Sequence, residues 1–80
     1  MTDLSPEALR AFVRVAELAS FTQAALSLGL PKASASGAVQ RLERSLGTRL
    51  FHRTTRRVQL TPDGQAFYER AKDLLADLDD

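Results

Sequence analysis

The sequence contains no cysteine, only one histidine and no long apolar run. Without cysteine, the chain can form neither a disulfide framework nor a thiolate metal site. A lone histidine does not indicate a metal site either, so His52 is interpreted as a strand residue and no cofactor is expected. The longest apolar run is far too short to span a bilayer, and the first ten residues, which include Asp3, form no apolar signal segment. A cytoplasmic protein without a membrane partner is therefore expected.

The patterns by which enzyme active sites are recognised are also absent from the sequence. There is no Gly-rich phosphate loop, no cluster of metal ligands and no nucleophile beside a plausible base. The chain is therefore not expected to be an enzyme. Its 80 residues suffice for one small domain. A domain of this size buries about 60–65% of the surface that its unfolded chain exposes, so a partner or a dimer would stabilise it.

The positive charge is concentrated in one segment of the chain. The whole chain has a formal net charge of +1, but residues 32–57 contain seven lysines and arginines and a single carboxylate. The segments on either side, 1–31 and 58–80, are both net negative. A basic segment of this kind indicates an anionic partner, with nucleic acid as the leading candidate.

Start and stop signals predict three helices in the first half of the chain. Ser5 precedes a proline and suits a helix N-cap, and "SFTQ" at 20–23 has the form of a capping box. The predicted helices are Pro6–Leu18, a short helix between the Ser20 cap and Gly29, and a third helix from Pro31 to about Leu46. The second and third helices, separated by a short turn with glycine, form a helix-turn-helix pattern at about residues 21–40. Spacing alone fits an ordinary helical hairpin equally well, and the basic segment favours DNA.

The hydrophobic period falls towards two after the third helix. This change predicts a β-hairpin at about residues 50–60 with a polar, basic tip, which is a wing. Thr61 and Pro62 then open a last helix. Its apolar residues are spaced four, three and four apart and predict a dimerising coiled-coil-like seam, with packing of its first half inside the domain as the alternative. The predicted dimer residues are Phe67, Ala71, Leu74 and Leu78.

The third predicted helix combines an apolar stripe with an opposite face of unusually low relief. The stripe consists of Ala35, Val39, Leu42 and Leu46, and the opposite face of Ala33, Gly37, Gln40 and Arg44. A glycine in a helix costs roughly 1 kcal/mol relative to alanine. Low relief would let the helix enter a DNA major groove, which is about 12 Å wide. On this hypothesis Gly37 marks a point of close approach, although neutral drift would leave the same residue.

The stretch "SFTQAALSLGLPKASASGAVQRLERSLGTRLFHRTTRRVQLTPDG" resembles the DNA-binding domain of LysR-type transcriptional regulators. The resemblance implies a mainly α fold, a winged helix-turn-helix of three helices and a two-stranded β-hairpin wing, followed by a long dimerising linker helix. It implies a DNA-binding domain at 1–61 and a linker helix at 62–80. Two departures are Pro31-Lys32-Ala33, where the family commonly has Ser-Gln-Pro, and Gly37, where it usually has a long polar residue, often arginine.

Family members continue into an effector-binding domain of periplasmic-binding-protein type, which is absent from this chain. A small-molecule effector is therefore expected only through that C-terminal domain, and a higher oligomer only in the full-length protein. The resemblance implies sequence-specific binding to double-stranded DNA by a homodimer. A symmetric dimer would require an interrupted, near-palindromic operator.

The candidate DNA contacts fall into two groups. The residues expected to read bases from the third helix are Lys32, Ala33, Ser36, Gly37 and Gln40. The residues expected at the backbone or the minor groove are Thr22, Ser34, Arg41, Arg53, Thr54, Arg56 and Arg57. Glu43, which lies among arginines, is expected to make local ion pairs.

Each of these assignments has a plainer alternative. Lys32 would be a solvated lysine, Ser34 and Ser36 would bond to nearby backbone, and Thr22 would only cap its helix. Any single wing arginine would be solvated. The rival function for the whole chain is a protein-interaction module whose basic face meets an acidic protein.

Overall fold

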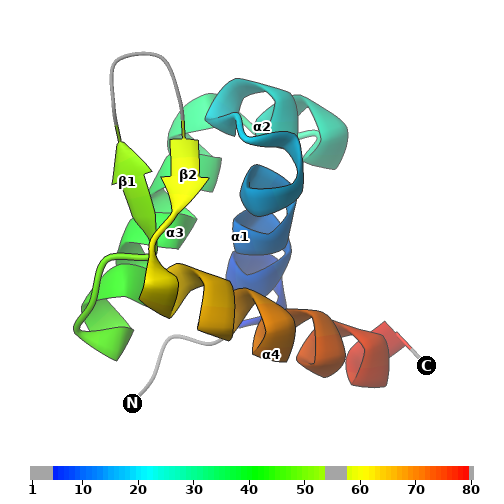
Figure 1. The fold of residues 1–80 in the computed structure, drawn as a ribbon. Coiled ribbons are helices and arrows are strands. Elements are labelled where there is room, and N and C mark those ends of the chain that lie inside the picture. The colour runs from blue at the N-terminus through cyan, green and yellow to red at the C-terminus, as the bar shows by residue number, and fades with distance from the viewer. Residues whose placement is uncertain (1–4, 54–57, 80) are drawn as a thin grey trace.

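The computed structural model describes residues 5–53 and 58–79, which form four helices and one two-stranded sheet (Figure 1). The elements are α1 Pro6–Leu18, α2 Phe21–Leu28, α3 Lys32–Leu46, β1 Phe51–Arg53, β2 Val58–Leu60 and α4 Pro62–Asp79. The strands pair antiparallel, with Phe51 opposite Leu60 and Arg53 opposite Val58. The predicted order of helix-turn-helix, hairpin and long last helix is therefore confirmed. No helix in this part of the chain is both long and apolar enough to cross a membrane.

The helix boundaries follow from local capping. Ser5 Oγ accepts a hydrogen bond from the amide of Ala8, and Ser20 Oγ accepts one from the amide of Gln23. Gly29 ends α2 in the left-handed conformation at a φ of 68°. The end of α1 differs, because Ala19 adopts this conformation at a φ of 52° without being glycine. The predicted bounds of α1, Pro6–Leu18, are confirmed, although no signal identified Ala19 as its C-cap. Helix α3 begins at Lys32, one residue after the predicted Pro31, which is its N-cap without a side-chain hydrogen bond.

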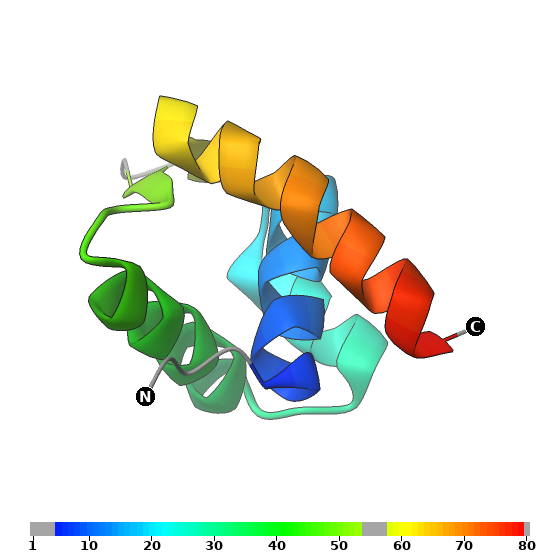
Figure 2. The same ribbon diagram turned by 90° about the horizontal axis from the view of Figure 1, so that it is seen from below.

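Helix α1 lies at the centre of the domain, and the other elements pack around it (Figures 1 and 2). Phe12 is fully buried, and its ring centroid is 5.4 Å from that of Phe51 on β1 and 5.2 Å from that of Phe67 on α4. The small side chains Ala24 and Ala25 are buried in α2, which packs against α1 and α3. One aromatic cluster thus joins the hairpin and the last helix to α1.

The first half of α4 packs against α1, which corrects part of the predicted dimer seam. Phe67 contacts the ring of Phe12, and Ala71 is fully buried within the same core. Leu74 and Leu78, by contrast, are 43% and 56% exposed. Within the predicted seam Ala71 is therefore buried in its own domain and Phe67 is half-buried there, whereas Leu74 and Leu78 are exposed to a second chain.

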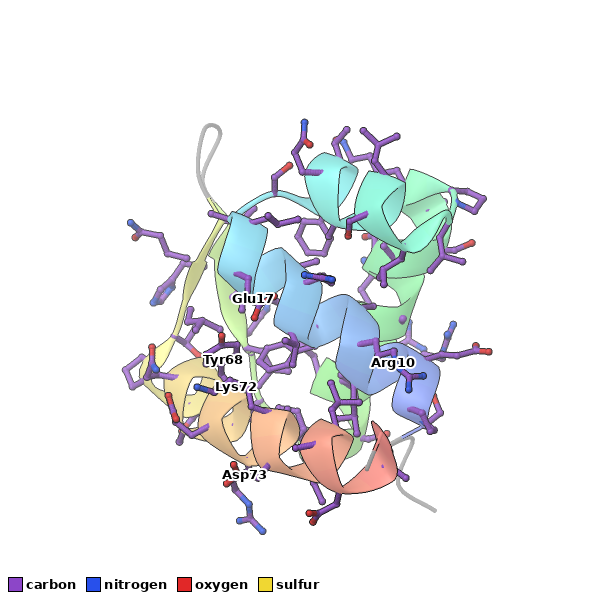
Figure 3. The ribbon with its side chains drawn as sticks, turned by 90° about the vertical axis from the view of Figure 1, so that its right-hand side faces the viewer. Arg10, Glu17, Tyr68, Lys72 and Asp73 are labelled. Atoms are coloured by element: carbon purple, nitrogen blue, oxygen red, sulfur yellow. The ribbon has the colours of Figure 1, made fainter. Side chains whose placement is uncertain are left out.

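Polar contacts reinforce the packing of α4 on α1 (Figure 3). The hydroxyl of Tyr68 lies 3.5 Å from Glu17 Oε2 on α1, and Lys72 Nζ lies 4.8 Å from the centroid of the Tyr68 ring. Lys72 also pairs with Glu69 at 3.4 Å. These groups are exposed, so each contact contributes only a few tenths of a kcal/mol. Their side chains line the edge of an interface whose energy comes from the aromatic core.

The junction between the hairpin and α4 has no room for a side chain at Gly64. Thr61 Oγ1 caps α4 by accepting a hydrogen bond from the Gly64 amide at 2.9 Å, and it donates to the carbonyl oxygen of Arg49 at 2.7 Å. A Cβ added to Gly64 would overlap the carbonyl oxygen of Leu50 and lie 2.9 Å from its carbonyl carbon. Glycine is therefore required here by close backbone approach.

We expect Gly64→Ala to lower the free energy of unfolding by roughly 3 kcal/mol, because the backbones of α4 and the segment before β1 must separate. The matched control is Gly37→Ala, whose added Cβ would make only an ordinary contact. That variant should gain up to about 1 kcal/mol from helix propensity. Urea unfolding of both variants tests the contrast, and equal stability of Gly64→Ala and the wild type would contradict it.

Candidate nucleic-acid interface

The buried side of α3 fixes which of its faces meets solvent. Ala35, Val39 and Leu42 are fully buried, as predicted, and Ala38 extends this side although the predicted stripe did not include it. Leu46 is half-buried at the helix end. With 3.6 residues per turn, the opposite face carries Ala33, Gly37, Gln40 and Arg44. The low-relief face predicted from the sequence is therefore turned away from the core.

The five residues expected to read bases all lie on α3. Lys32 is its first residue, and it is exposed together with Ala33 and Gln40, whereas Ser36 and Gly37 are half-buried. Helical spacing places the last four within one half of the helix circumference. They form a shallow surface with short side chains, to which Lys32 and Gln40 contribute the long ones.

The residues expected at the DNA backbone are spread over three elements. Thr22 is exposed in the first turn of α2, Ser34 and Arg41 are exposed on one flank of α3, and Arg53 is the last residue of β1. The end of β1 lies at the same end of the molecule as α2, and α4 lies at the opposite end (Figure 1). The remaining expected wing contacts lie outside the described residues: Thr54, Arg56 and Arg57.

The exposed charges are distributed unevenly over the domain. The exposed cations of α3 and the loop after it are Lys32, Arg41, Arg44 and Arg49. The exposed carboxylates of α4 are Asp63, Glu69, Asp73 and Asp77, and the same helix carries the exposed cations Arg70 and Lys72. The two sets meet where the loop after α3 contacts the start of α4, because Thr48, next to Arg49, bonds to Asp63. Within residues 5–53 and 58–79, no three His, Asp or Glu side chains are placed to hold a metal ion.

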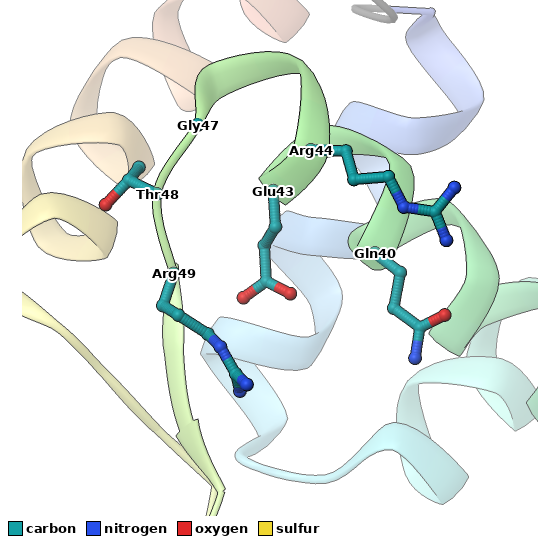
Figure 4. A pocket seen from close by; sticks show the side chains of 6 residues that line it. All are labelled: Gln40, Glu43, Arg44, Gly47, Thr48 and Arg49. Carbon is teal, nitrogen blue, oxygen red and sulfur yellow. The ribbon is translucent and has the colours of Figure 1, made fainter.

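An open depression of about 610 Å³ lies between the end of α3 and the segment leading into β1 (Figure 4). In this view the carboxylate of Glu43 lies between Arg49 on one side and Gln40 and Arg44 on the other. The depression is lined by Gln40, Glu43, Arg44, Gly47, Thr48 and Arg49. It continues the low-relief face towards the hairpin, because Gln40 and Arg44 belong to both.

Glu43 accepts backbone hydrogen bonds, whereas only local ion pairs are expected from the sequence. Its Oε2 accepts hydrogen bonds from the amides of Leu50 and Phe51, at 2.8 and 3.4 Å. A second contact joins the same loop to the last helix, since Thr48 Oγ1 donates to Asp63 Oδ2 at 2.8 Å. These bonds fix where β1 starts relative to α3. Sequence reasoning missed this function of Glu43, because nothing in local spacing pairs it with an amide seven residues later.

Residues 6–65 match the sequence-family model of bacterial regulatory helix-turn-helix proteins of the lysR family. The chain belongs to this family. Over 71 residues it is 55% identical to the uncharacterized HTH-type transcriptional regulator YhjC of Escherichia coli (strain K12), covering 89% of this chain and 24% of that protein. Over 73 residues it is 48% identical to an HTH-type transcriptional repressor of Pseudomonas aeruginosa (strain UCBPP-PA14), covering 91% of this chain and 23% of that protein. It thus spans about a quarter of the length of these relatives.

Solved structures of LysR-type proteins have the same fold as this chain. The complex of BenM_DBD with catB site 1 DNA aligns at a TM-score of 0.89 and 41% identity, covering 94% of this chain and 83% of that chain. Oxidized OxyR of Corynebacterium glutamicum aligns at a TM-score of 0.91 and 37% identity, covering 94% of this chain and 23% of that chain. Full-length CbnR with its target DNA aligns at a TM-score of 0.86 and 33% identity, covering 90% of this chain and 25% of that chain. These likenesses confirm the predicted winged helix-turn-helix and the resemblance to LysR-type regulators.

We expect Glu43→Ala to lower the free energy of unfolding by about 2 kcal/mol, because two backbone amides lose their acceptor. Glu43→Gln keeps a side-chain carbonyl oxygen at this place and should lose clearly less. Urea unfolding of the two variants beside the wild type measures the difference. Equal losses for both would mean that the negative charge, and not the hydrogen bonds, holds the start of β1.

Proposed function

We propose that the chain is the DNA-binding part of a LysR-type transcriptional regulator and binds double-stranded DNA sequence-specifically. The observation that carries this proposal is the exposed face of α3, which combines short side chains with flanking cations. The similar domain of BenM was solved with DNA, which supports the same role here. Regulation of transcription by the relatives supports a binding role and not an enzymatic one.

In this proposal the N-terminal half of α3 enters the major groove and reads base edges. A groove about 12 Å wide admits an α-helix, and the first residues of a recognition helix reach deepest. Lys32 donates to guanine O6 and N7, and Ala33 contacts a thymine methyl group. Ser36 and Gln40 follow on the same face. The small side chains between them let the helix backbone lie close to the bases.

The second group of contacts holds the duplex without reading it. Thr22, at the start of α2, and Ser34, on one flank of α3, bind phosphate oxygens. The wing cations bind phosphates or enter a narrow minor groove, where the negative potential is enhanced. These are Arg53, Arg56 and Arg57, with Thr54 beside them. The net negative α4 faces away from the duplex, so the uneven charge distribution orients the domain on DNA.

The whole protein acts as a homodimer on an interrupted, near-palindromic operator, because a two-fold dimer presents two identical reading helices. Residues 1–61 form the DNA-binding domain, and residues 62–80 begin a linker helix that dimerises. A small-molecule effector binds a further domain outside this chain, and the full-length protein can assemble further. Access to chromosomal DNA places the protein in the cytoplasm.

The test is titration of fluorescent duplexes, drawn from a selected site and a scrambled control, at two or more salt concentrations. The chain should prefer the selected site, and Lys32→Ala should cost roughly 1–3 kcal/mol on it and relax the preference at one base position. The matched control is Lys72→Ala on α4, which removes the same charge from the opposite end and should leave the base preferences unchanged.

Two results would contradict this function. If the chain binds an acidic polypeptide as tightly as it binds the selected duplex, and does not discriminate between duplexes, it is a protein-interaction module. If Lys32→Ala lowers only the salt dependence and leaves base preferences intact, Lys32 binds phosphate and the reading residues lie further along α3.

We also expect the double variant Leu74→Asp, Leu78→Asp to be monomeric, because it places carboxylates in the exposed half of the predicted seam. Leu26→Asp on α2 is the matched control, since this leucine is 69% exposed and lies outside the seam. Sedimentation at high protein concentration compares the three chains. A wild-type chain that is already monomeric there would show that Leu74 and Leu78 hold no dimer of this chain.

A further inference from the structure

Gly37 lies in the middle of α3, and nothing in the domain itself requires a glycine there. Its backbone is helical, and an added Cβ would meet only one neighbouring group, the guanidinium of Arg41, at 3.7 Å from Nη1. That distance is an ordinary van der Waals contact. Gly64 differs in this respect, because an added Cβ there would overlap the backbone of Leu50 and glycine is sterically required. The neighbour that a side chain at position 37 would meet is thus the guanidinium of Arg41 and not backbone.

Arg41 extends back along α3 and places its guanidinium at the level of Gly37. Side chains in an α-helix tilt towards the N-terminus, so a residue covers the turn before its own. A cavity of about 280 Å³ lies on this side of α3, and Glu7 of α1 also lines it. The contribution of α3 to the cavity is four short residues and Arg41: Ala33, Ser34, Gly37, Ala38 and Arg41. The short residues leave open the path that the arginine side chain takes.

We propose that Arg41 reads a guanine in the major groove and that Gly37 is its positioning residue. The proposal rests on the DNA-binding function proposed above. A guanidinium presents a planar fork of donors that matches guanine O6 and N7, and base edges are read from the N-terminal half of a recognition helix. Arg41 lies one turn C-terminal to Gly37, and its guanidinium lies beside Gly37 in the N-terminal half of α3. Arg41 is then a specificity determinant and not a backbone contact.

A long side chain at position 37 would occupy the space in which the guanidinium lies. Alanine adds one carbon at an ordinary contact distance from Arg41 Nη1, and leucine adds three more carbons beyond that Cβ. Gly37→Leu should therefore displace Arg41 from the reading face while favouring the helix, because leucine is the better helix former. Loss of binding in this variant would then reflect the displaced arginine and not an unfolded helix.

The first experiment measures the 80-residue chain, Arg41→Ala and Arg41→Lys on a library of duplexes at several salt concentrations. Arg41→Ala should lose one guanine preference and bind the best site roughly 10- to 100-fold more weakly. Arg41→Lys should keep the salt slope of the wild type and weaken that preference only in part, because lysine keeps the charge and can donate to guanine without the planar fork. If Arg41→Ala keeps the guanine preference and lowers only the salt slope, Arg41 is a charge beside phosphate and the inference is overturned.

The second experiment is a double-mutant cycle between positions 37 and 41. Gly37→Leu should abolish the same guanine preference in the wild-type background and have little further effect when residue 41 is alanine. Ala66→Leu, which adds an exposed leucine to α4, should leave binding unchanged. Equal losses in both backgrounds would mean that residue 37 itself faces the bases, which overturns the inference.

Failure of the proposed function is distinguishable from failure of this inference. A wild-type chain that binds no duplex with base preference overturns both. A wild-type chain whose base preferences all survive Arg41→Ala overturns the inference alone. Thermal unfolding of every variant beside the wild type shows that the compared chains are folded.

Discussion

The packing of Phe12 between Phe51 and Phe67 is the contact on which the rest of the domain depends. Its ring lies within 5.4 Å of both partners, which come from the hairpin and from α4. Truncating a buried phenylalanine typically costs about 3–5 kcal/mol, a large share of the 5–15 kcal/mol by which most domains are stable. A chain of 80 residues has few other large side chains to bury. The orientation of the hairpin and of α4 is thus fixed from one point on α1.

The same constraint decides what α3 can present to a partner. Its buried side packs against α1 through small and medium residues, and Glu43 ties its far end to the amides that precede and begin β1. The end of α3 and the start of β1 are therefore held together by hydrogen bonds from backbone amides to the Glu43 carboxylate. Under the proposed function, α3 and the start of β1 would meet a duplex with their relative position already fixed, with little ordering entropy to overcome.

The sequence predicts the elements well because their signals are local. Ser5, Ser20 and Thr61 cap helices through bonds spanning three residues, so the sequence alone places these starts. What it cannot place depends on tertiary contact. A spacing of four and three shows that Ala71 is buried, but not whether its partner is α1 or a second chain. Gly64 likewise looks like an ordinary motif residue until the Leu50 carbonyl is found against it. In the same way, Gly37 is an unexplained residue in the sequence, and the guanidinium beside it gives a physical reason to test.

The division of α4 into a packed half and an exposed half links the reading face to the dimer. The helix begins directly at Thr61 after the hairpin, and Gly64 brings its first turn against the backbone of Leu50. Because Ala71 is fixed in the same core that holds α3, the direction in which Leu74 and Leu78 point is set relative to α3. A dimer formed through those leucines would therefore hold its two reading helices at a spacing determined by this domain. Half-site separation, under the proposed function, is then a consequence of core packing and not of a flexible linker.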